Sequence, residues 1–158
     1  MFGVYSFIDN NHKILNKQED QYFAKEFGTH LIAIFYEISD DILKDTKGIY
    51  KTIINSLKED GFHIVKKSLF KVKSPKNYPA VSIDVIFLES GLQFSTYPEY
   101  NSALLDFHSC RGENDGLKIY NDLCSYLRPK RTFEQIISIK FSSKNNSTQD
   151  LESIINNS

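Results

Sequence analysis

Glu89 and Ser90 are the two residues of this 158-residue chain whose types and placement could do chemistry on the chain itself. They are expected at the tip of a β-hairpin, where the serine hydroxyl can be held against the preceding carbonyl carbon. Strain and donors to the developing oxyanion would favour an acyl shift from nitrogen to oxygen. If a base then removes the α-proton of Ser90, β-elimination and hydrolysis leave a pyruvoyl group on the second fragment.

Residues suited to proton transfer follow on a later predicted strand. His108 and Cys110 are two residues apart, so their side chains share one face of that strand. An imidazole can act as a base for a proton. Ser82 lies eight residues before Ser90 and, in a hairpin turning just before Ser90, is expected roughly opposite Ser95.

A longer pattern that includes these residues resembles the S-adenosylmethionine decarboxylases of the small bacterial and archaeal type, which depend on a pyruvoyl group. The pattern comprises Gly28 and His30, Val81-Ser82, Glu89-Ser90, Thr96-Tyr97-Pro98-Glu99, Asp106 and Cys110. The resemblance implies self-cleavage between Glu89 and Ser90. The family has a histidine at the position of Ser95, where it acts as the base for elimination, and usually another at Gly91. We hypothesise that His108 supplies the displaced imidazole, with Ser82 as a second helper in processing.

The same resemblance implies roles in decarboxylation. Ser90 would become the pyruvoyl cofactor, an electron sink that replaces pyridoxal phosphate, with no metal. Cys110 resembles the residue that returns a proton to the substrate α-carbon, and Glu99 resembles an acidic substrate contact. Phe70, as an aromatic surface for an adenine, and Leu92 are further candidates for the substrate site. The product would be the aminopropyl donor for spermidine synthesis, part of polyamine biosynthesis.

Two other functions stay open. A pyruvoyl decarboxylase acting on ornithine or arginine would keep the cofactor and change the pocket, for which positions 91 and 95 and the loop 71–80 give room. A non-catalytic homologue that regulates an active paralogue would explain the serine at position 95. Absence of chain cleavage together with co-purification of a related subunit would favour the regulator.

The elements that position these residues follow from hydrophobic periodicity and turn residues. Strands are predicted over 30–38, 62–72, 81–88, 92–97, 103–110 and 132–141, and helices over 39–61 and 117–127. This order predicts an α+β fold: a mostly antiparallel sheet with two helices packed on one face. Because the second face would be left open, we expect dimerisation into an αββα sandwich. We divide the chain into an N-terminal extension (1–27), the decarboxylase-like domain (28–141) and a polar, frayed tail (142–158).

Composition narrows the setting of this domain. The net charge of −1 gives no electrostatic case for binding nucleic acid or an anionic membrane. No apolar run is long enough to span a bilayer, and the first residues do not form a signal peptide, so a cytoplasmic protein is expected. The four histidines lack metal-ligand spacing. His12 and His63 are expected at the surface, and His30 is expected to face the packed sheet or cap its end.

Overall fold

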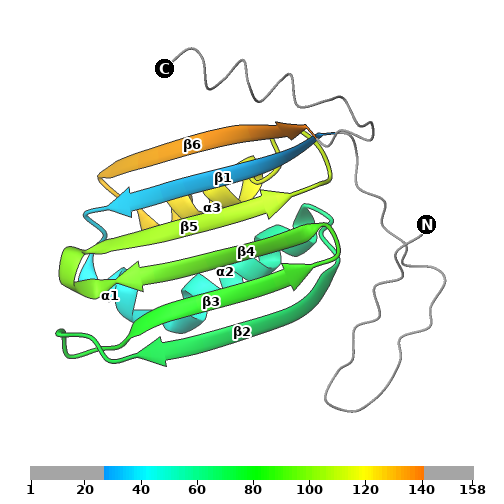
Figure 1. The fold of residues 1–158 in the computed structure, drawn as a ribbon. Coiled ribbons are helices and arrows are strands. Elements are labelled where there is room, and N and C mark those ends of the chain that lie inside the picture. Colours follow the sequence, from blue (N-terminus) through cyan, green and yellow to red (C-terminus); the bar gives the residue numbers. More distant parts are fainter. Residues whose placement is uncertain (1–26, 141–158) are drawn as a thin grey trace, which may run out of the picture.

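The protein is described by a computed structural model that covers residues 27–140 (Figure 1). The proposed N-terminal extension, apart from Phe27, and the C-terminal tail lie outside these residues. The elements are β1 (Phe27–Tyr36), α1 (Asp40–Lys44), α2 (Thr46–Glu59), β2 (Ile64–Val72), β3 (Ala80–Phe87), β4 (Ser90–Tyr97), a 3-10 turn (Pro98–Tyr100), β5 (Ser102–Ser109), α3 (Leu117–Leu127) and β6 (Arg131–Lys140).

One antiparallel sheet carries all six strands in the order β2-β3-β4-β5-β1-β6. The helices lie together behind this sheet and leave its other face open (Figure 1). The predicted α+β class with helices on one face is therefore confirmed, and six strands occur where six were expected.

The first helical segment differs from the prediction, because it is two helices and not one. Asp45 lies between α1 and α2 with a non-helical ψ of 66°, and its carboxylate accepts a hydrogen bond from the Gly48 amide at 2.9 Å. An aspartate at this position caps the free amides of a new helix. The apolar periodicity runs through the break, so it hides the cap, and the described part of the chain has three helices.

A Phe-rich core fills the space between the sheet and the helices. Phe35, Phe94 and Phe107 are fully buried on the helix-facing side of the sheet. They are joined by buried aliphatic residues from α2 and α3, including Ile53 and Leu123. Burying a side chain of this size stabilises the fold by about 1.5–3 kcal/mol relative to leaving it in water. This packing fixes the register of β1, β3, β4 and β5, because a slip by one residue would turn their core side chains to the open face.

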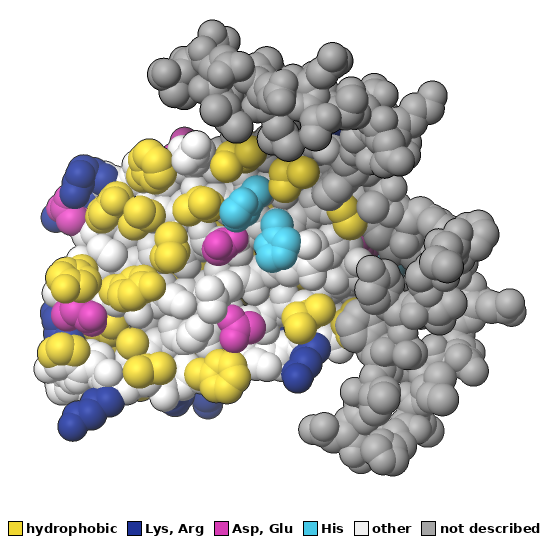
Figure 2. Space-filling model, viewed as in Figure 1, with side chains coloured by type: hydrophobic (Ala, Val, Ile, Leu, Met, Phe, Trp, Pro, Cys, Tyr) yellow, Lys and Arg dark blue, Asp and Glu magenta, His cyan; other side chains and the backbone are white. Residues whose placement is uncertain are grey.

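The open face of the sheet is mixed in character, with apolar side chains scattered among histidine, acidic and uncharged polar groups (Figure 2). Its large exposed apolar residues, which are 39–55% accessible, are Phe70, Val72, Ile86, Tyr97, Phe133 and Ile137. Among the described residues, no helix is both long and apolar enough to cross a membrane.

Candidate active site at the Glu89–Ser90 turn

The hairpin between β3 and β4 has the tight turn that the sequence predicts. Phe87 pairs with Ser90, which leaves Leu88 and Glu89 as the two loop residues. Ser90 has a φ of 151°, a backbone conformation that L-residues rarely adopt. Holding a non-glycine residue in such a region costs on the order of 1–3 kcal/mol. Strain is therefore concentrated at the residue that follows the Glu89 carbonyl.

Two donors from one residue hold that carbonyl. The oxygen of Glu89 accepts hydrogen bonds from the backbone amide of Cys110 at 2.9 Å and from its Sγ at 3.0 Å. Burial is the main reason that the pKa of the Cys110 thiol is raised, with the Glu89 and Asp115 carboxylates adding to it. The thiol therefore keeps its proton near neutral pH and can act as a donor. Paired donors on one carbonyl oxygen are the arrangement that stabilises an oxyanion.

The side chain of Glu89 is also held in place. It is only 1% exposed, and its Oε1 lies 2.5 Å from Nδ1 of His63. The backbone amide of His63 donates to Oε2 at 3.2 Å. We expected His63 at the surface without a partner. Its ring is 64% exposed, but the expectation missed its bond to Glu89, because nothing in the spacing of the two residues reveals it.

A network of hydrogen bonds supports the end of β5 below this turn. The guanidinium of Arg111 donates to the Asp60 carbonyl at 2.7 Å and to Asp115 at 3.1 Å, and it lies 3.8 Å over the ring of Phe62. The hydroxyl of Ser109 donates to the same Asp115 carboxylate at 2.8 Å. Although burial opposes it, the nearby carboxylates raise the pKa of Arg111, so its positive charge is retained. The segment that carries Cys110 is thereby fixed against the helices.

His108 lies on the open face, next to the turn. It pairs with Gly91 across β4 and β5, and its Cε1 and Nε2 are 3.6 and 3.8 Å from the place that a Cβ on Gly91 would occupy. His108 therefore covers the side of position 91 from which a side chain is missing. A shallow hollow of about 290 Å³ is lined by Asp84, Val85, Ile86, Ser90, Gly91, Leu92, Gln93, Asp106 and His108.

His30 and Asp106 extend this polar group along the open face. Nε2 of His30 lies 2.8 Å from Oδ1 of Asp106, and the His30 and His108 rings meet edge to face with centroids 6.0 Å apart. Figure 2 shows histidines beside an acidic side chain on this face. His30 is partly exposed here, so the expectation that it faces the packed side or caps the sheet is wrong. The two-residue alternation from the buried Leu31 indicates the correct face.

The remaining predicted site residues lie apart from the turn. The hydroxyl oxygens of Ser82 and Ser95 are 3.3 Å apart, as their predicted cross-strand pairing requires. Ser95 is four residues along β4 from Gly91, which corresponds to about 13 Å in a strand. Phe70 pairs with Ser82 and is 54% exposed. Ser82, Ser95 and Phe70 thus form a second group on the open face, which we call the serine row.

The positions of Glu99 and Leu92 do not fit a single pocket around Ser90. Glu99 is exposed in the turn after β4, at the opposite end of that strand from Ser90. Leu92 lines the hollow, but its side chain is 3% exposed and belongs to the core. Within one copy of the chain, the turn gathers Glu89, Ser90, Cys110 and His108, whereas Ser82, Phe70 and Glu99 lie elsewhere.

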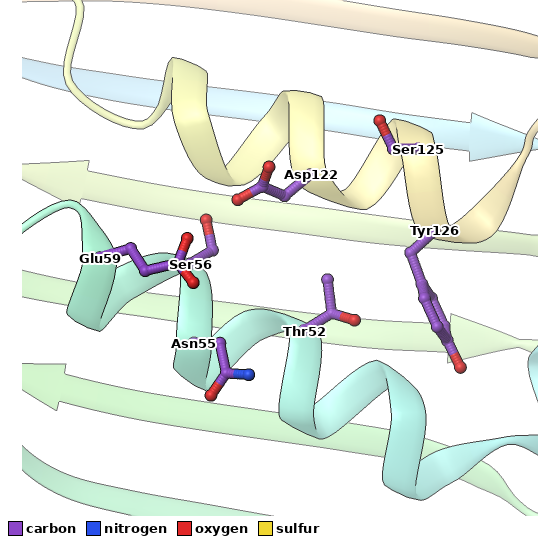
Figure 3. A pocket seen from close by; sticks show the side chains of 7 residues that line it. All are labelled: Thr52, Asn55, Ser56, Glu59, Asp122, Ser125 and Tyr126. Atoms are coloured by element: carbon purple, nitrogen blue, oxygen red, sulfur yellow. The ribbon is translucent and has the colours of Figure 1, made fainter.

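A polar groove also lies on the helix side of the molecule. Figure 3 shows its lining, which comes from α2 and α3: Thr52, Asn55, Ser56, Glu59, Asp122, Ser125 and Tyr126. Lys118 bridges Glu59 and Asp122 at 3.0 and 2.6 Å, and its hydrogen bond is the main reason that the pKa of Asp122 is lowered. Both acidic groups of this groove are thus bound by the same lysine within the fold. In the described part of the chain, no group of three or more His, Cys, Asp or Glu side chains is placed to hold a metal ion.

Fold and turn together define an α+β protein with a strained Glu-Ser hairpin whose carbonyl is held by a cysteine. The family model described as S-adenosylmethionine decarboxylase matches residues 29–138. S-adenosylmethionine decarboxylase proenzymes of Aeropyrum pernix and Sulfurisphaera tokodaii are both 31% identical to this chain. The matches cover 66% and 68% of this chain and 78% and 84% of theirs. The crystal structure of the adenosylmethionine decarboxylase of Aquifex aeolicus shares the fold, with a TM-score of 0.65 at 19% identity over 78% of this chain and all of that one.

The chain belongs to the S-adenosylmethionine decarboxylase family. The predicted resemblance is thereby confirmed. The relatives from Aeropyrum pernix and Sulfurisphaera tokodaii are both named as proenzymes.

Proposed function

We propose that this chain is a self-cleaving proenzyme that breaks its own bond between Glu89 and Ser90 and then decarboxylates S-adenosylmethionine. The observation that carries the proposal is the Glu89 carbonyl, which takes two hydrogen bonds from Cys110 and precedes a serine with a φ of 151°. A hydroxyl, a strained backbone and an oxyanion site meet at one peptide bond. This arrangement fits the formation of a pyruvoyl group from Ser90.

Cleavage would begin when Oγ of Ser90 attacks the carbonyl carbon of Glu89. The negative charge that develops on the carbonyl oxygen is stabilised by the amide and thiol of Cys110. The C–N bond then breaks, its nitrogen takes up a proton, and Glu89 is joined to Ser90 through an ester. Removal of the α-proton of Ser90 expels the Glu89 carboxylate and leaves dehydroalanine. Its imine tautomer takes up water and releases ammonia, which gives the keto group.

His108 is the base proposed for the α-proton. Its ring lies against Gly91, the residue directly after Ser90, and both Ser90 and His108 line the same hollow. A side chain positioned as a general base typically raises the rate of a proton-transfer step by about 10²–10⁴-fold. Ser82, hydrogen-bonded to Ser95, is the second proposed helper.

In the decarboxylation itself, the pyruvoyl group supplies an electron sink for the electrons released with carbon dioxide. Cys110 is proposed to return a proton to the substrate α-carbon. The raised pKa of its thiol supports this role, because a donor must still hold its proton at working pH.

Substrate contacts are proposed for Phe70 and Glu99, and for Leu92 through its backbone, because its side chain is buried in the core. Phe70 and Glu99 lie too far along the sheet to reach Ser90 in the same copy of the chain. We therefore propose that a second copy packs against the open face, giving the αββα sandwich expected from the sequence. The exposed apolar side chains on that face support this arrangement. The partner's serine row would then lie across from the Glu89–Ser90 turn.

A basic amino acid such as ornithine or arginine is the second candidate substrate. Asp84 and Asp106 both line the hollow beside Ser90, and Asp106 also contacts His30. Carboxylates there would suit the side-chain cation of ornithine or arginine as well as the sulfonium of S-adenosylmethionine. Among these candidates, S-adenosylmethionine is favoured by the names of the relatives.

Release of labelled carbon dioxide tests the choice of substrate. Carboxyl-labelled S-adenosylmethionine, ornithine and arginine would each be incubated with the purified chain. We expect release from S-adenosylmethionine to exceed the other two by a large factor. Preferential release from ornithine or arginine would favour the second candidate. No release from any of them by a cleaved chain would contradict both, and no release by an intact chain would favour the regulatory homologue.

A further inference from the structure

The residue before the proposed cleavage site is held at both of its ends. Cys110 holds the main-chain carbonyl of Glu89, and His63 holds its side chain through two hydrogen bonds, at 2.5 Å from Nδ1 and 3.2 Å from the backbone amide. No step of the proposed mechanism uses the contact with His63. The two contacts together fix the orientation of the peptide unit that would react.

His63 is anchored well enough to act as the fixed part of this contact. It lies between α2 and β2, and its carbonyl accepts a hydrogen bond from the amide of Leu88 at 3.0 Å. The backbone of His63 therefore binds both loop residues of the hairpin. The preceding residue, Phe62, is 5% exposed and packs against Phe87 with ring centroids 4.7 Å apart.

The other charged groups near this carboxylate are already engaged. Arg111 donates to Asp60 and Asp115, and the carboxylate of Asp115 also accepts from Ser109. The charges of Arg111 and Glu89 attract each other, but the hydrogen bonds of Arg111 go to these other partners. Glu89 is 1% exposed, and burying a carboxylate without a hydrogen-bonded partner is costly. The imidazole of His63 is the side chain that meets this requirement, with its Nδ1 hydrogen donated to the carboxylate.

We propose that His63 is a positioning residue for the self-cleavage reaction. By holding the side chain of Glu89 inside the turn, it keeps the scissile carbonyl on the two Cys110 donors. Without the imidazole, only the backbone amide of residue 63 still holds the carboxylate from this side, so the Glu89 side chain shifts toward water and its carbonyl moves away from the Cys110 donors. This inference rests on the proposed function, because it concerns the rate of that cleavage.

Donor-matched variants at position 63 test the inference. His63→Asn keeps an N–H donor near the place of Nδ1, whereas His63→Ala removes it. We expect the alanine variant to cleave about 10- to 100-fold more slowly than wild type, since a misplacement near 1 Å can cost about 10²-fold. The asparagine variant should stay within a few fold of wild type. Because the His63 side chain is 64% exposed, its place is open to solvent. Added imidazole should therefore partly restore the cleavage rate of the alanine variant.

Each variant would be followed by intact mass over time, with its melting temperature measured in parallel. Lys67→Ala, at an exposed position on β2, is the control and should cleave like wild type. Equal rates for wild type and His63→Ala would overturn the inference alone. Equal slowing of the alanine and asparagine variants without rescue by imidazole would also overturn it, since that is the behaviour of a purely structural residue. A wild-type chain that is never cleaved would overturn the proposed function and this inference with it.

Discussion

Each end of β4 has a residue with a positive φ and a network of polar groups, but only one end is arranged to react. Ser90 begins the strand with a φ of 151°, and Asn101, just beyond its other end, has a φ of 50°. Each belongs to a polar network that joins distant parts of the chain. At the far end, Asp40 accepts hydrogen bonds from the hydroxyl of Tyr78 at 2.8 Å and from Nζ of Lys76 at 3.2 Å.

The difference lies in how each unusual residue is satisfied. Asn101 adopts the left-handed conformation that asparagine tolerates, and its amide donates to the Ile38 carbonyl at 3.1 Å and to Asp40 at 3.2 Å. Ser90 adopts a conformation suited to glycine, and the donors there are directed at the preceding carbonyl. At one end, the hydrogen bonds of Asn101 therefore offset the cost of its positive φ. At the other end the same features are arranged around a bond that a hydroxyl can attack.

Replacing His108 is expected to have the largest effect, and the quantity that changes is the rate of cleavage at the Ser90 end of β4. In His108→Phe, the acyl shift can still occur, but removal of the Ser90 α-proton should slow by about 10²–10⁴-fold. The ester between Glu89 and Ser90 should accumulate, and hydroxylamine should split it to give two fragments. Mass spectrometry with and without hydroxylamine measures this. Normal cleavage in His108→Phe would show that another group is the base.

Replacing the Cys110 thiol should have the next largest effect. Cys110→Ala keeps the backbone amide donor and loses Sγ, and we expect cleavage to slow by about 10- to 100-fold, less than for the loss of a strong oxyanion donor. Cys110→Ser restores a hydrogen-bond donor and should recover most of the rate. Because burial raises the pKa of the thiol above its usual 9.0, the difference between wild type and Cys110→Ala should persist at pH 9. Its disappearance at that pH would contradict the account.

Glycine at the two ends of β4 should act in opposite directions. Ser90→Gly relieves the strained φ and should raise the free energy of unfolding by about 1 kcal/mol. The uncleavable Ser90→Ala is the proper reference, since both chains stay intact. Asn101→Gly keeps the backbone conformation but loses the amide hydrogen bonds, which should lower the free energy of unfolding by about 1–2 kcal/mol. Urea unfolding measures both. If both substitutions changed the free energy of unfolding in the same direction, the proposed difference between the two ends of β4 would be contradicted.

The Asp40 network should give the smallest effect on the free energy of unfolding, and this effect should be lost in acid. The hydrogen bond from Tyr78, followed by that from Lys76, holds the pKa of Asp40 below its usual 3.8. Its stabilising effect is therefore present above pH 3.8 and is lost as the pH falls through the lower folded value. We expect Asp40→Asn to be less stable than wild type at pH 7 and the gap to narrow below pH 3.8. A constant gap in urea unfolding across that range would contradict this explanation.

Local patterns in the sequence predicted most of the fold. Alternating apolar residues defined the strands, and the tight connection before Ser90 defined the hairpin. The break at Asp45 was missed because a helix cap and a polar surface residue look alike within an unbroken apolar stripe. Contacts between charged or polar residues from distant segments were harder to predict than this helix break. His63 and Glu89 are 26 residues apart, and His30 and Asp106 are 76 apart. The pairing of β1 with β5 brings His30 to Asp106, and the pairing of β2 with β3 brings His63 to the turn. The spacing of the residues within each pair does not reveal these strand partners.

The site was predicted only in part, because some of its contacts also join segments that are distant in the sequence. The pairing of Ser82 with Ser95 follows from hairpin register alone. The donors from Cys110 to the Glu89 carbonyl depend on how β5 ends beside the turn, which the sequence does not specify. Two groups of candidate residues, the turn and the serine row, lie about 13 Å apart along the sheet, as counted in strand residues. Reasoning from one chain could not distinguish a single pocket from a site shared between two copies.

Intact mass of the freshly purified wild-type chain tests the central claim most directly. The account predicts two fragments that correspond to residues 1–89 and 90–158, with the second starting in a keto group that a hydrazine reagent traps. The Ser90→Ala chain should remain whole under the same conditions. A wild-type chain found intact, with no trapped keto terminus after prolonged incubation, would contradict self-cleavage at this turn.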